Sequence, residues 1–522
     1  MLGMSKPFRL WTIDQPLFLP PTVQDFVGDD HLARFVLNLV REEVDLKEIM
    51  DSYRSMRGQP PYDPTMMTTL LLYAYSRGIY SSRRIAKACR EGVDFMSIVG
   101  LDAPDFHTIA EFRKRHLKAL GKLFQQVLLL CEQAGLAKLG HVGLDGSKIK
   151  ANASKHKAMS YERMEQRAAE LEAQVAGWFD TAAAADAAED RLHGADKTGE
   201  EMPDWVTDKK QRAARIREAK AELEAEAKAA AEAKRAAAEA AAAQREAEGR
   251  RKGGRQAAPP SPAPDAKVQK NFTDPESRIM KSKDGFVQAY NVQAAVDATA
   301  QVIVAHGVTQ SGADSGQLIP MVDAIEANLG RKPEQLSADA GYCSEANLAA
   351  LEDRKIDGYV ATGRAKDAAA GGRDREAKAA APPPTTALDG GTTAAPSAPA
   401  PAAAVDNDTI SVPSEAPPAT ALDGEAPAAP SAPAPAAAPK RVEAMRAKIK
   451  AGGHASPYRL RKQLPEPVFG QIKQARGFRQ FLMRGFAKVQ DEWAMVCTAH
   501  NVLKLFQGRT LSAAQAMTAQ TG

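Results

Sequence analysis

Cysteine is scarce in this sequence, and the few copies are widely separated. The four cysteines stand at positions 89, 131, 343 and 497, and no two of them form a CxxC pair. Zinc ribbons and disulfide-stapled secreted domains need closely spaced or numerous cysteines. We therefore expect neither a structural zinc site nor a disulfide framework, and a reducing cytoplasm as the compartment.

Long hydrophobic runs and nucleotide-binding motifs are missing as well. The most apolar run, residues 66–75, contains threonines and is far shorter than the roughly 20 residues that cross a bilayer. No segment has the layout of a signal peptide. Neither a P-loop nor an HExxH motif occurs. These absences predict no membrane insertion, no nucleotide cofactor and no zinc-protease chemistry.

A strong net charge is also lacking, but the charge is unevenly distributed. The whole chain carries +4, whereas residues 441–522 hold fourteen Lys and Arg against four Asp and Glu, a net +10. A basic block of this size favours a polyanion such as nucleic acid as the partner. A solvated basic surface is the alternative interpretation.

Three separated segments each present one acidic residue beside small or basic residues. In the first, the apolar run 142–144 ends on Asp145, and Lys148 and Lys150 follow. This pattern predicts a short strand that ends on a carboxylate next to two ammonium groups. Taken alone, such an acid is usually a solvated turn residue.

Two further acids occur in comparable settings downstream. Asp339 ends the short apolar segment 335–338, again before small residues. Glu466 stands before Pro467, which suits the first position of a helix, so we expect this carboxylate at a helix N-terminus. Glu492 is a rival third acid, and its alternative interpretation is a charge on a helix surface.

Converging carboxylates with lysine and arginine neighbours suit phosphodiester chemistry. Hard divalent cations prefer carboxylate oxygens, and Mg²⁺ uses one or two of them together with substrate phosphate. Two such ions about 3.5–4 Å apart activate a nucleophile and stabilise the leaving oxygen. The three acids therefore predict a Mg²⁺ site, with Mn²⁺ as the alternative ion.

The motifs around these acids resemble the DDE transposases of bacterial insertion sequences. The resemblance rests on LDGSKIKANAS at 144–154, NFTDPESRIMKSKDGFVQAYNVQAAVD at 271–297, SADAGY at 337–342 and EPVFGQIK at 466–473. The group called the eleven-eighty-two family is the most similar. Membership implies an RNase H-like core that needs no ATP, and an N-terminal domain that recognises the ends of the element.

The resemblance also implies roles for individual residues. Asp145, Asp339 and Glu466 would be the catalytic residues and the ligands of the metal. Contacts to DNA are expected from Lys148, Lys150, Tyr342, Arg461, Lys473 and Arg476. The superfamily signature Tyr-x2-Arg-x3-Glu-x6-Lys is met except at one place: four residues separate Arg461 from Glu466, and Lys462 has the expected spacing instead. A core aromatic is the alternative interpretation of Tyr342.

Composition and periodicity divide the chain into seven predicted segments. They are a helical DNA-binding domain at 1–137, core segments at 138–155, 269–364 and 441–510, a helical hairpin at 156–268, a disordered Ala/Pro-rich linker at 365–440, and a frayed tail at 511–522. Within the core segments we expect strands at 286–296, 301–308 and 358–362, helices at 318–329 and 344–353, and one long amphipathic helix at 478–506. The fold class is therefore α/β, an RNase H-like core interrupted by two insertions and preceded by an all-α domain.

The two helical segments leave alternatives open. In the first, short helices at 83–90 and after a capping box at Thr108 and Glu111 could form a helix-turn-helix, or an ordinary helical domain with a basic face. In the hairpin, Met164, Ala168 and Leu171 begin a heptad seam, and residues 221–247 are nearly all Ala, Glu, Lys and Arg. This arm would serve dimerisation or DNA clamping, or be a solvated spacer.

The sequence as a whole predicts a DNA transposase. Its partners would be double-stranded DNA at element ends and target, and further copies of the chain in a homodimer or larger assembly. Metal-dependent cleavage would free a 3′-OH for attack on target DNA. The alternatives are a related RNase H-fold nuclease and a degenerate transposase that acts only as a DNA-binding protein.

Overall fold

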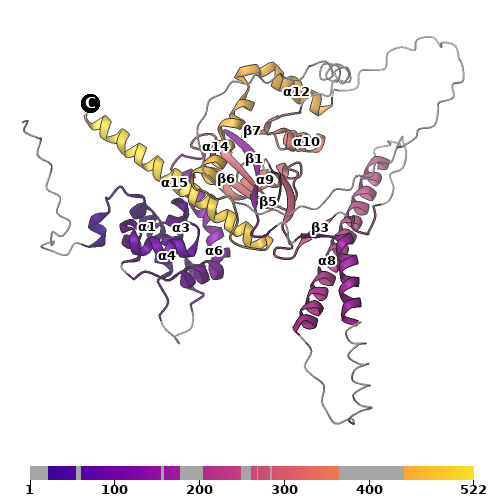
Figure 1. The fold of residues 1–522 in the computed structure, drawn as a ribbon. Coiled ribbons are helices and arrows are strands. Elements are labelled where there is room, and N and C mark those ends of the chain that lie inside the picture. The colour runs from indigo at the N-terminus through magenta and orange to yellow at the C-terminus, as the bar shows by residue number, and fades with distance from the viewer. Residues whose placement is uncertain are drawn as a thin grey trace, which may run out of the picture. The chain divides into compact units, whose positions relative to one another are not determined.

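The structure is a computed structural model that combines a helical N-terminal region with a mixed sheet and its covering helices (Figure 1). It describes residues 22–53, 60–100, 102–154, 158–176, 204–247, 260–266, 268–282, 285–363 and 440–521. The predicted linker at 365–440 lies outside these residues except for its last position. The α/β class and the helical N-terminal region are confirmed.

Residues 22–133 fold into helices around a shared apolar core. Helix α3 is buried on every side from Met67 to Ser76, which is why its sequence shows no polar face. Asp63 caps it by accepting hydrogen bonds from the next turn, and Pro64 takes its first position. The helices are η1 (Val23–Phe26), α1 (Leu32–Glu42), α2 (Lys47–Met50), α3 (Pro64–Ser76), α4 (Ser82–Glu91), α5 (Val93–Val99) and α6 (Phe106–Gln133).

Helix α6 differs from the short capped helix expected near Thr108. It spans 28 residues, and Asp105 rather than Thr108 is its N-cap, accepting a hydrogen bond from the Thr108 N–H at 2.8 Å. Twelve of its residues, between Ile109 and Cys131, are buried, and it packs against the C-terminal helix α15 (Phe486–Thr521). The predicted capping box is therefore wrong, and the N-terminal helices share an interface with the rest of the chain.

A six-stranded mixed sheet forms the centre of the remaining chain. Along the sheet the order is β4-β5-β1-β7-β8, and β6 pairs with β5. Strand β1 runs antiparallel to β5 and parallel to β7, which in turn is parallel to β8. The strands are β1 (His141–Lys150), β4 (Arg278–Ser282), β5 (Gly285–Asp297), β6 (Ile303–Thr309), β7 (Gln335–Ala338) and β8 (Asp357–Val360).

Helices cover this sheet where the strands are most apolar. Strand β5 is buried from Gln288 to Asp297, so both of its faces are covered there. Helix α9 (Leu318–Leu329) packs on β5 and β6, α10 (Glu345–Asp353) on β8, and α15 on β6. The positions predicted for β5, β6, α9, α10 and β8 agree with the structure to within a few residues.

Strand β1 is longer than its apolar run. It continues through Asp145 to Lys150 because β5 pairs with it along its whole length. Its parallel partner β7 stops earlier, and the last pair is Leu144 with Ala338. The expectation that Asp145 ends a strand is therefore wrong. Asp145 instead follows the last position at which β1 is paired on both edges.

The segment between β1 and β3 (Gln269–Asn271) contains two packed helices. Residues 161–176 are helical and lie against α8 (Asp204–Ala247). Their contact is a small apolar cluster formed by Met164, Ala168, Leu171, Ala213, Ile216, Ala219 and Leu223. Buried Lys270 reaches Glu222 at 2.5 Å and Glu226 at 3.2 Å, which ties α8 to β3. Strand β2 (Ala158–Ser160), which pairs with β3, was not predicted.

The C-terminal part differs from the single helix predicted at 478–506. Helix α15 begins only at Phe486, and residues 477–485 are irregular, with positive φ at Gly477 and Gly485. It then continues to Thr521, whereas the frayed tail at 511–522 stays a prediction. Before it lie α12 (Arg441–Gly452), η4 (Gly453–Ala455), η5 (Pro457–Arg459), α13 (Leu460–Gln463), α14 (Pro465–Gly470) and a π-helical turn at Gln471–Ala475.

Candidate active site

Asp145 and Asp339 lie side by side at the point where β1 and β7 separate. Leu144 and Ala338 are the last registered pair of these parallel strands, so each acid is the next residue on its own chain. Asp339 then caps the 3-10 turn η3 (Ala340–Tyr342) by accepting a hydrogen bond from the Gly341 N–H at 2.8 Å. Asp145 accepts one from the Gly146 N–H, also at 2.8 Å.

Glu466 is joined to this pair through Arg461. The guanidinium Nη2 lies 3.1 Å from a carboxylate oxygen of Glu466, and Nη1 lies 3.9 Å from Asp339. The Arg461 side chain is 14% exposed, against 36% for Asp339 and 48% for Glu466. Arg461 is thus more buried than the two carboxylates that it contacts. It makes these contacts although its spacing from Glu466 departs from the superfamily signature.

Helix α14 delivers Glu466, but from a different position than expected. The helix begins at Pro465, two residues before Pro467, so Glu466 is the second residue of its first turn. Val468 and Phe469 are buried and fix the helix against the sheet. Gly143 permits this close approach, since a Cβ there would lie 2.8 Å from the Pro465 ring.

The electrostatics of Asp145 differ from those of an ordinary surface acid. Its pKa is raised to about 6, chiefly by burial and also by nearby Asp339 and Asp314, whereas the Gly146 N–H and Arg461 oppose the shift. The carboxylates therefore repel one another at neutral pH. Such repulsion is typical of sites that are completed by a cation.

Asp314 is a fourth acid of this neighbourhood that the sequence did not predict. Its Oδ1 accepts hydrogen bonds from Asn291 at 2.6 Å and Gln293 at 2.9 Å, and its Oδ2 lies 3.4 Å from Lys148 Nζ. A Cβ on Gly146 would lie 2.6 Å from Asp314, so only glycine fits there without a shift. The local sequence, an acid shortly before an amphipathic helix, gave no signal for this contact.

The donor set fits a hard cation, although the side chains are not arranged as a closed metal site. Within the described residues, no group of three or more His, Cys, Asp or Glu side chains is gathered closely enough to hold a metal ion. Carboxylate oxygens are the donors that Mg²⁺ prefers. Arg461, however, lies between Asp339 and Glu466, so direct binding by all three acids requires it to move.

Glu492, the rival third acid, has a structural role. It is fully buried, and its carboxylate accepts hydrogen bonds from the N–H groups of Leu482 and Met483 at 2.9–3.1 Å. Burial raises its pKa to about 7. The interpretation as a helix-surface charge is wrong, because this side chain fastens the irregular loop before α15.

Four of the six residues expected to contact DNA lie along β1 or beside the candidate acids. Lys150 is exposed at the end of β1, and Lys473 reaches Ser147 Oγ at 2.8 Å, close along β1 to Asp145. Lys148 pairs with Asp314, and Arg461 contacts Asp339 and Glu466.

Two other expected DNA contacts are contradicted by the side-chain positions. Tyr342 is fully buried and donates a hydrogen bond to Gln293 Oε1, so it is a core aromatic. Arg476 turns inward, with Nη2 3.0 Å from His500 Nδ1, and burial lowers its pKa. Sequence position placed both beside catalytic motifs, but gave no information about which way the side chains point.

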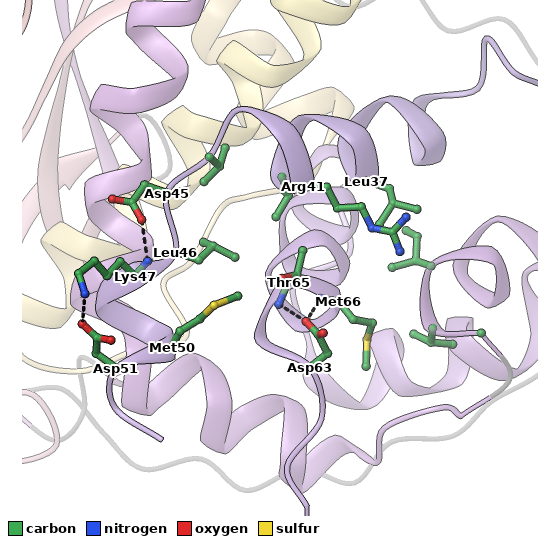
Figure 2. Close-up of a pocket in the computed structure, with 15 residues that line it drawn as sticks. Leu37, Arg41, Asp45, Leu46, Lys47, Met50, Asp51, Asp63, Thr65 and Met66 are labelled. Atoms are coloured by element: carbon green, nitrogen blue, oxygen red, sulfur yellow. Dashed lines mark hydrogen bonds and ion pairs between the residues drawn. The ribbon is translucent and has the colours of Figure 1, made fainter. Parts of the chain in front are cut away.

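A hollow lies in the N-terminal region, and none of the candidate acids lines it. Its volume is about 680 Å³, and apolar side chains of α1 and α2 share its wall with charged ones (Figure 2). Figure 2 shows Lys47 paired with Asp51, and Asp63 engaged at the start of α3. Lys47 and Asp51 thus form an ion pair and Asp63 caps α3, so these three groups have structural roles in the wall.

Comparison with known proteins gives two family matches, one at each end of the chain. Residues 21–115 match a transposase domain (DUF772), and residues 434–506 match a transposase DDE domain. The second match includes Arg461, Glu466 and Lys473, whereas Asp145 and Asp339 lie outside both. No curated protein and no solved structure matches the chain. No helix among the described residues is long and apolar enough to cross a bilayer. A transposase domain near the N-terminus followed by a DDE transposase domain supports an insertion-sequence DDE transposase.

Proposed function

We propose that this chain is the transposase of an insertion sequence of the eleven-eighty-two family, and that it cuts and joins DNA with Mg²⁺ or Mn²⁺. The observation that carries the proposal is the register of β1 and β7, which makes Asp145 and Asp339 neighbours. Arg461 links Glu466 to them. Acids from three distant segments thus occupy one neighbourhood.

The sheet supports an RNase H-like core. Across the sheet, β6, β5 and β1 are antiparallel neighbours. Strands β7 and β8 lie on the other side of β1 and run parallel to it. One acid within β1, a second directly after β7 and a third on helix α14 are the arrangement that such a core would use. Two insertions, between β1 and β3 and after β8, lengthen the sequence without interrupting this order.

In this mechanism Asp145, Asp339 and Glu466 hold the ions, and neighbouring cations hold the DNA. Bound divalent metal would supply activation of the nucleophile and stabilisation of the leaving oxygen. Lys473 and Lys150 would hold phosphates beside β1. Arg461 would leave Glu466 and turn to a phosphate oxygen, to which its planar guanidinium can donate two hydrogen bonds. The same pocket would then present the freed 3′-OH to target DNA.

Strand-transfer products test this function against its alternatives. Duplexes that carry the inverted repeats flanking the gene are incubated with Mg²⁺ and a target plasmid. Joined end–target products support a transposase. Cleavage without joining would indicate an RNase H-fold nuclease, and binding without cleavage would indicate a degenerate transposase.

Recognition of the element ends is assigned to the N-terminal helices, with α4 as the contact surface. Its buried side comprises Ser82, Ile85, Ala86 and Cys89, and its exposed side is basic. Arg83 lies over the Phe106 ring and Lys87 faces Glu91, which leaves Arg84 and Arg90 as the outward cations. Two or more copies of the chain would hold the two ends together.

The α4 assignment predicts a loss of binding in the double variant Arg84→Ala, Arg90→Ala. Each charge-assisted contact contributes about 1.5–3 kcal/mol, so the affinity for end DNA should fall at least about tenfold. Fluorescence anisotropy with end and random duplexes measures it. Lys122→Ala is the control, because Lys122 already pairs with Glu48 on the same domain. An unchanged affinity for end DNA would remove α4 from recognition.

Asp314 predicts a different kind of effect. Asp314→Asn removes the charge that holds Lys148 while keeping the side-chain size, so cleavage should slow by about tenfold or more through misplacement of the strand beside Asp145. DNA affinity should change little. Asp323→Asn, on the exposed side of α9, is the control. Full activity of Asp314→Asn, measured by single-turnover cleavage, would contradict this role.

A further inference from the structure

The segment that leaves β1 is bound tightly to the loop before α15. The Lys150 N–H donates to the Arg479 carbonyl at 3.2 Å, and the Phe481 N–H donates to the Lys150 carbonyl at 2.9 Å. Farther on, Asn152 Nδ2 donates to the Leu482 carbonyl at 2.7 Å. These bonds place Arg479 and Arg484 alongside the end of β1.

A small polar hollow lies where these segments meet. It has a volume of about 300 Å³ and is lined by Asn152, Ala153, Ser154, Thr273, Gln480 and Arg484. Amides, hydroxyls and one guanidinium make up its polar lining, and no carboxylate does. Such a lining combines hydrogen-bond donors with one positive charge, the combination that binds a phosphate oxygen.

The hollow is held in shape by bonds from behind. Fully buried Asn271 donates from Nδ2 to the Ser154 carbonyl at 2.7 Å, and its Oδ1 accepts from the Thr273 N–H at 2.8 Å. Arg484 Nε donates to the Asn152 carbonyl at 3.0 Å, and Gln480 Nε2 to the Ala151 carbonyl at 3.1 Å. A wall that is already ordered loses less conformational entropy when a ligand binds.

The positive charges beside the hollow have no carboxylate partners. Lys150, Arg479 and Arg484 are exposed, and in the part of the chain that the structure describes the two arginines bind only carbonyl or amide oxygens. Two acids lie next to Arg484 in the chain's path, but they accept hydrogen bonds from backbone groups: Asp274 from the Gly485 N–H and Glu276 from the Phe486 N–H. The cations are therefore available to an outside anion.

We propose that this hollow is a phosphate seat for the DNA backbone, at a fixed distance from the bond that is cut. This inference rests on the proposed function, because it takes the partner to be DNA. An extended chain from Asp145 to Asn152 spans about 23 Å. One DNA strand covers that length in about seven nucleotides. The strand would run from the acids along Lys150 and Arg479 to Arg484.

Two variants test the seat. Arg484→Ala removes its cation, and Ala153→Asp places a carboxylate in its wall. We expect each to weaken binding of a random-sequence duplex by about tenfold or more, and Arg484→Ala to lower the magnitude of the log K against log salt slope by about 0.9. Lys332→Ala removes one charge near the start of β7, the opposite end from Asp339, and should change neither quantity.

The measurement is made in the Asp145→Asn background, so that binding is scored without cleavage. Failure of the seat and failure of the catalytic proposal are then separate results. Thermal melting checks the fold of both variants. Arg484→Ala decides the matter if Ala153→Asp unfolds, since Arg484 is exposed. Native melting of Arg484→Ala together with unchanged affinity and salt slope would overturn the seat.

Discussion

Asp145→Asn, Asp339→Asn and Glu466→Gln should each abolish Mg²⁺-dependent cleavage at the element ends. Each change keeps the size of the side chain and removes a charged oxygen donor from the proposed metal site. Metal ions supply several kcal/mol of transition-state stabilisation, so the cleavage rate should fall about a thousandfold or more. Single-turnover cleavage of end duplexes with Mg²⁺, and again with Mn²⁺, measures this loss.

Binding separates a lost reaction from a lost fold. The affinity of these variants for end DNA should stay close to that of the unaltered chain, because the lysine and arginine side chains that hold phosphate are untouched. Asp323→Asn, an exposed acid paired with Arg354 on the covering helices, should cleave normally. Full cleavage by any one of the three variants would remove that residue from the mechanism.

Arg461 makes the third acid a sharper test than the other two. It lies 3.1 Å from Glu466 and is more buried than either acid it contacts. If Glu466 holds a metal ion, Arg461 must first release it, and Glu466→Gln removes both the metal ligand and that ion pair. If Glu466 instead serves only to place Arg461, then Arg461→Ala and Glu466→Gln should have equal effects on cleavage, and their combination should add nothing further.

Much of the sheet could be predicted because hydrophobic patterns mark buried strands directly. Strand β5 and helix α9 are examples, since their apolar periodicity is continuous over their whole length. The end of β1 could not be predicted in this way. Residues 145–150 are polar or glycine except for Ile149, and they remain a strand because β5 pairs with them, which is a contact between segments far apart in the sequence.

The site shows the same division between local and distant information. Motifs around Asp145, Asp339 and Glu466 indicated which acids to consider, and strand register explains how two of them meet. The sequence does not show in which direction a side chain points. The prediction that Tyr342 and Arg476 contact DNA is wrong for this reason, because both side chains point inward. Asp314 was missed because its role depends on Asn291, Gln293 and Lys148, none of which is near it in the sequence.

Helix packing also changes how end recognition should be tested. Removal of residues 1–137 would separate the functions cleanly only if those residues folded apart from the core. In the structure, α15 packs along both α6 and α3. Truncation would therefore expose apolar surface of α15, and loss of binding in the truncated chain would not identify the recognition surface. Point variants on the exposed side of α4 avoid this problem.

The pH dependence of stability should reveal the buried carboxyl of Glu492. Burial raises its pKa from 4.5 to about 7 in the folded chain, so the folded state binds this proton more tightly than the unfolded state. The resulting stability is complete below the unfolded pKa and is lost as the pH rises through the folded pKa. Between about pH 5 and about pH 8 the loss should be on the order of 3 kcal/mol.

Glu492→Gln isolates this contribution, because it cannot titrate. Below about pH 5 the variant should lie within about 1 kcal/mol of the unaltered chain, because both side chains are neutral there and one oxygen can accept from both the Leu482 and Met483 N–H groups. Toward pH 8 the variant should become the more stable of the two, since only the unaltered chain then carries a buried charge. Urea-unfolding midpoints over this pH range measure the change, and Glu443→Gln on the exposed α12 is the control. Parallel curves for Glu492→Gln and the unaltered chain would show that Glu492 does not titrate in this interval, and the buried carboxyl could not then be the source of any pH dependence in the loop before α15.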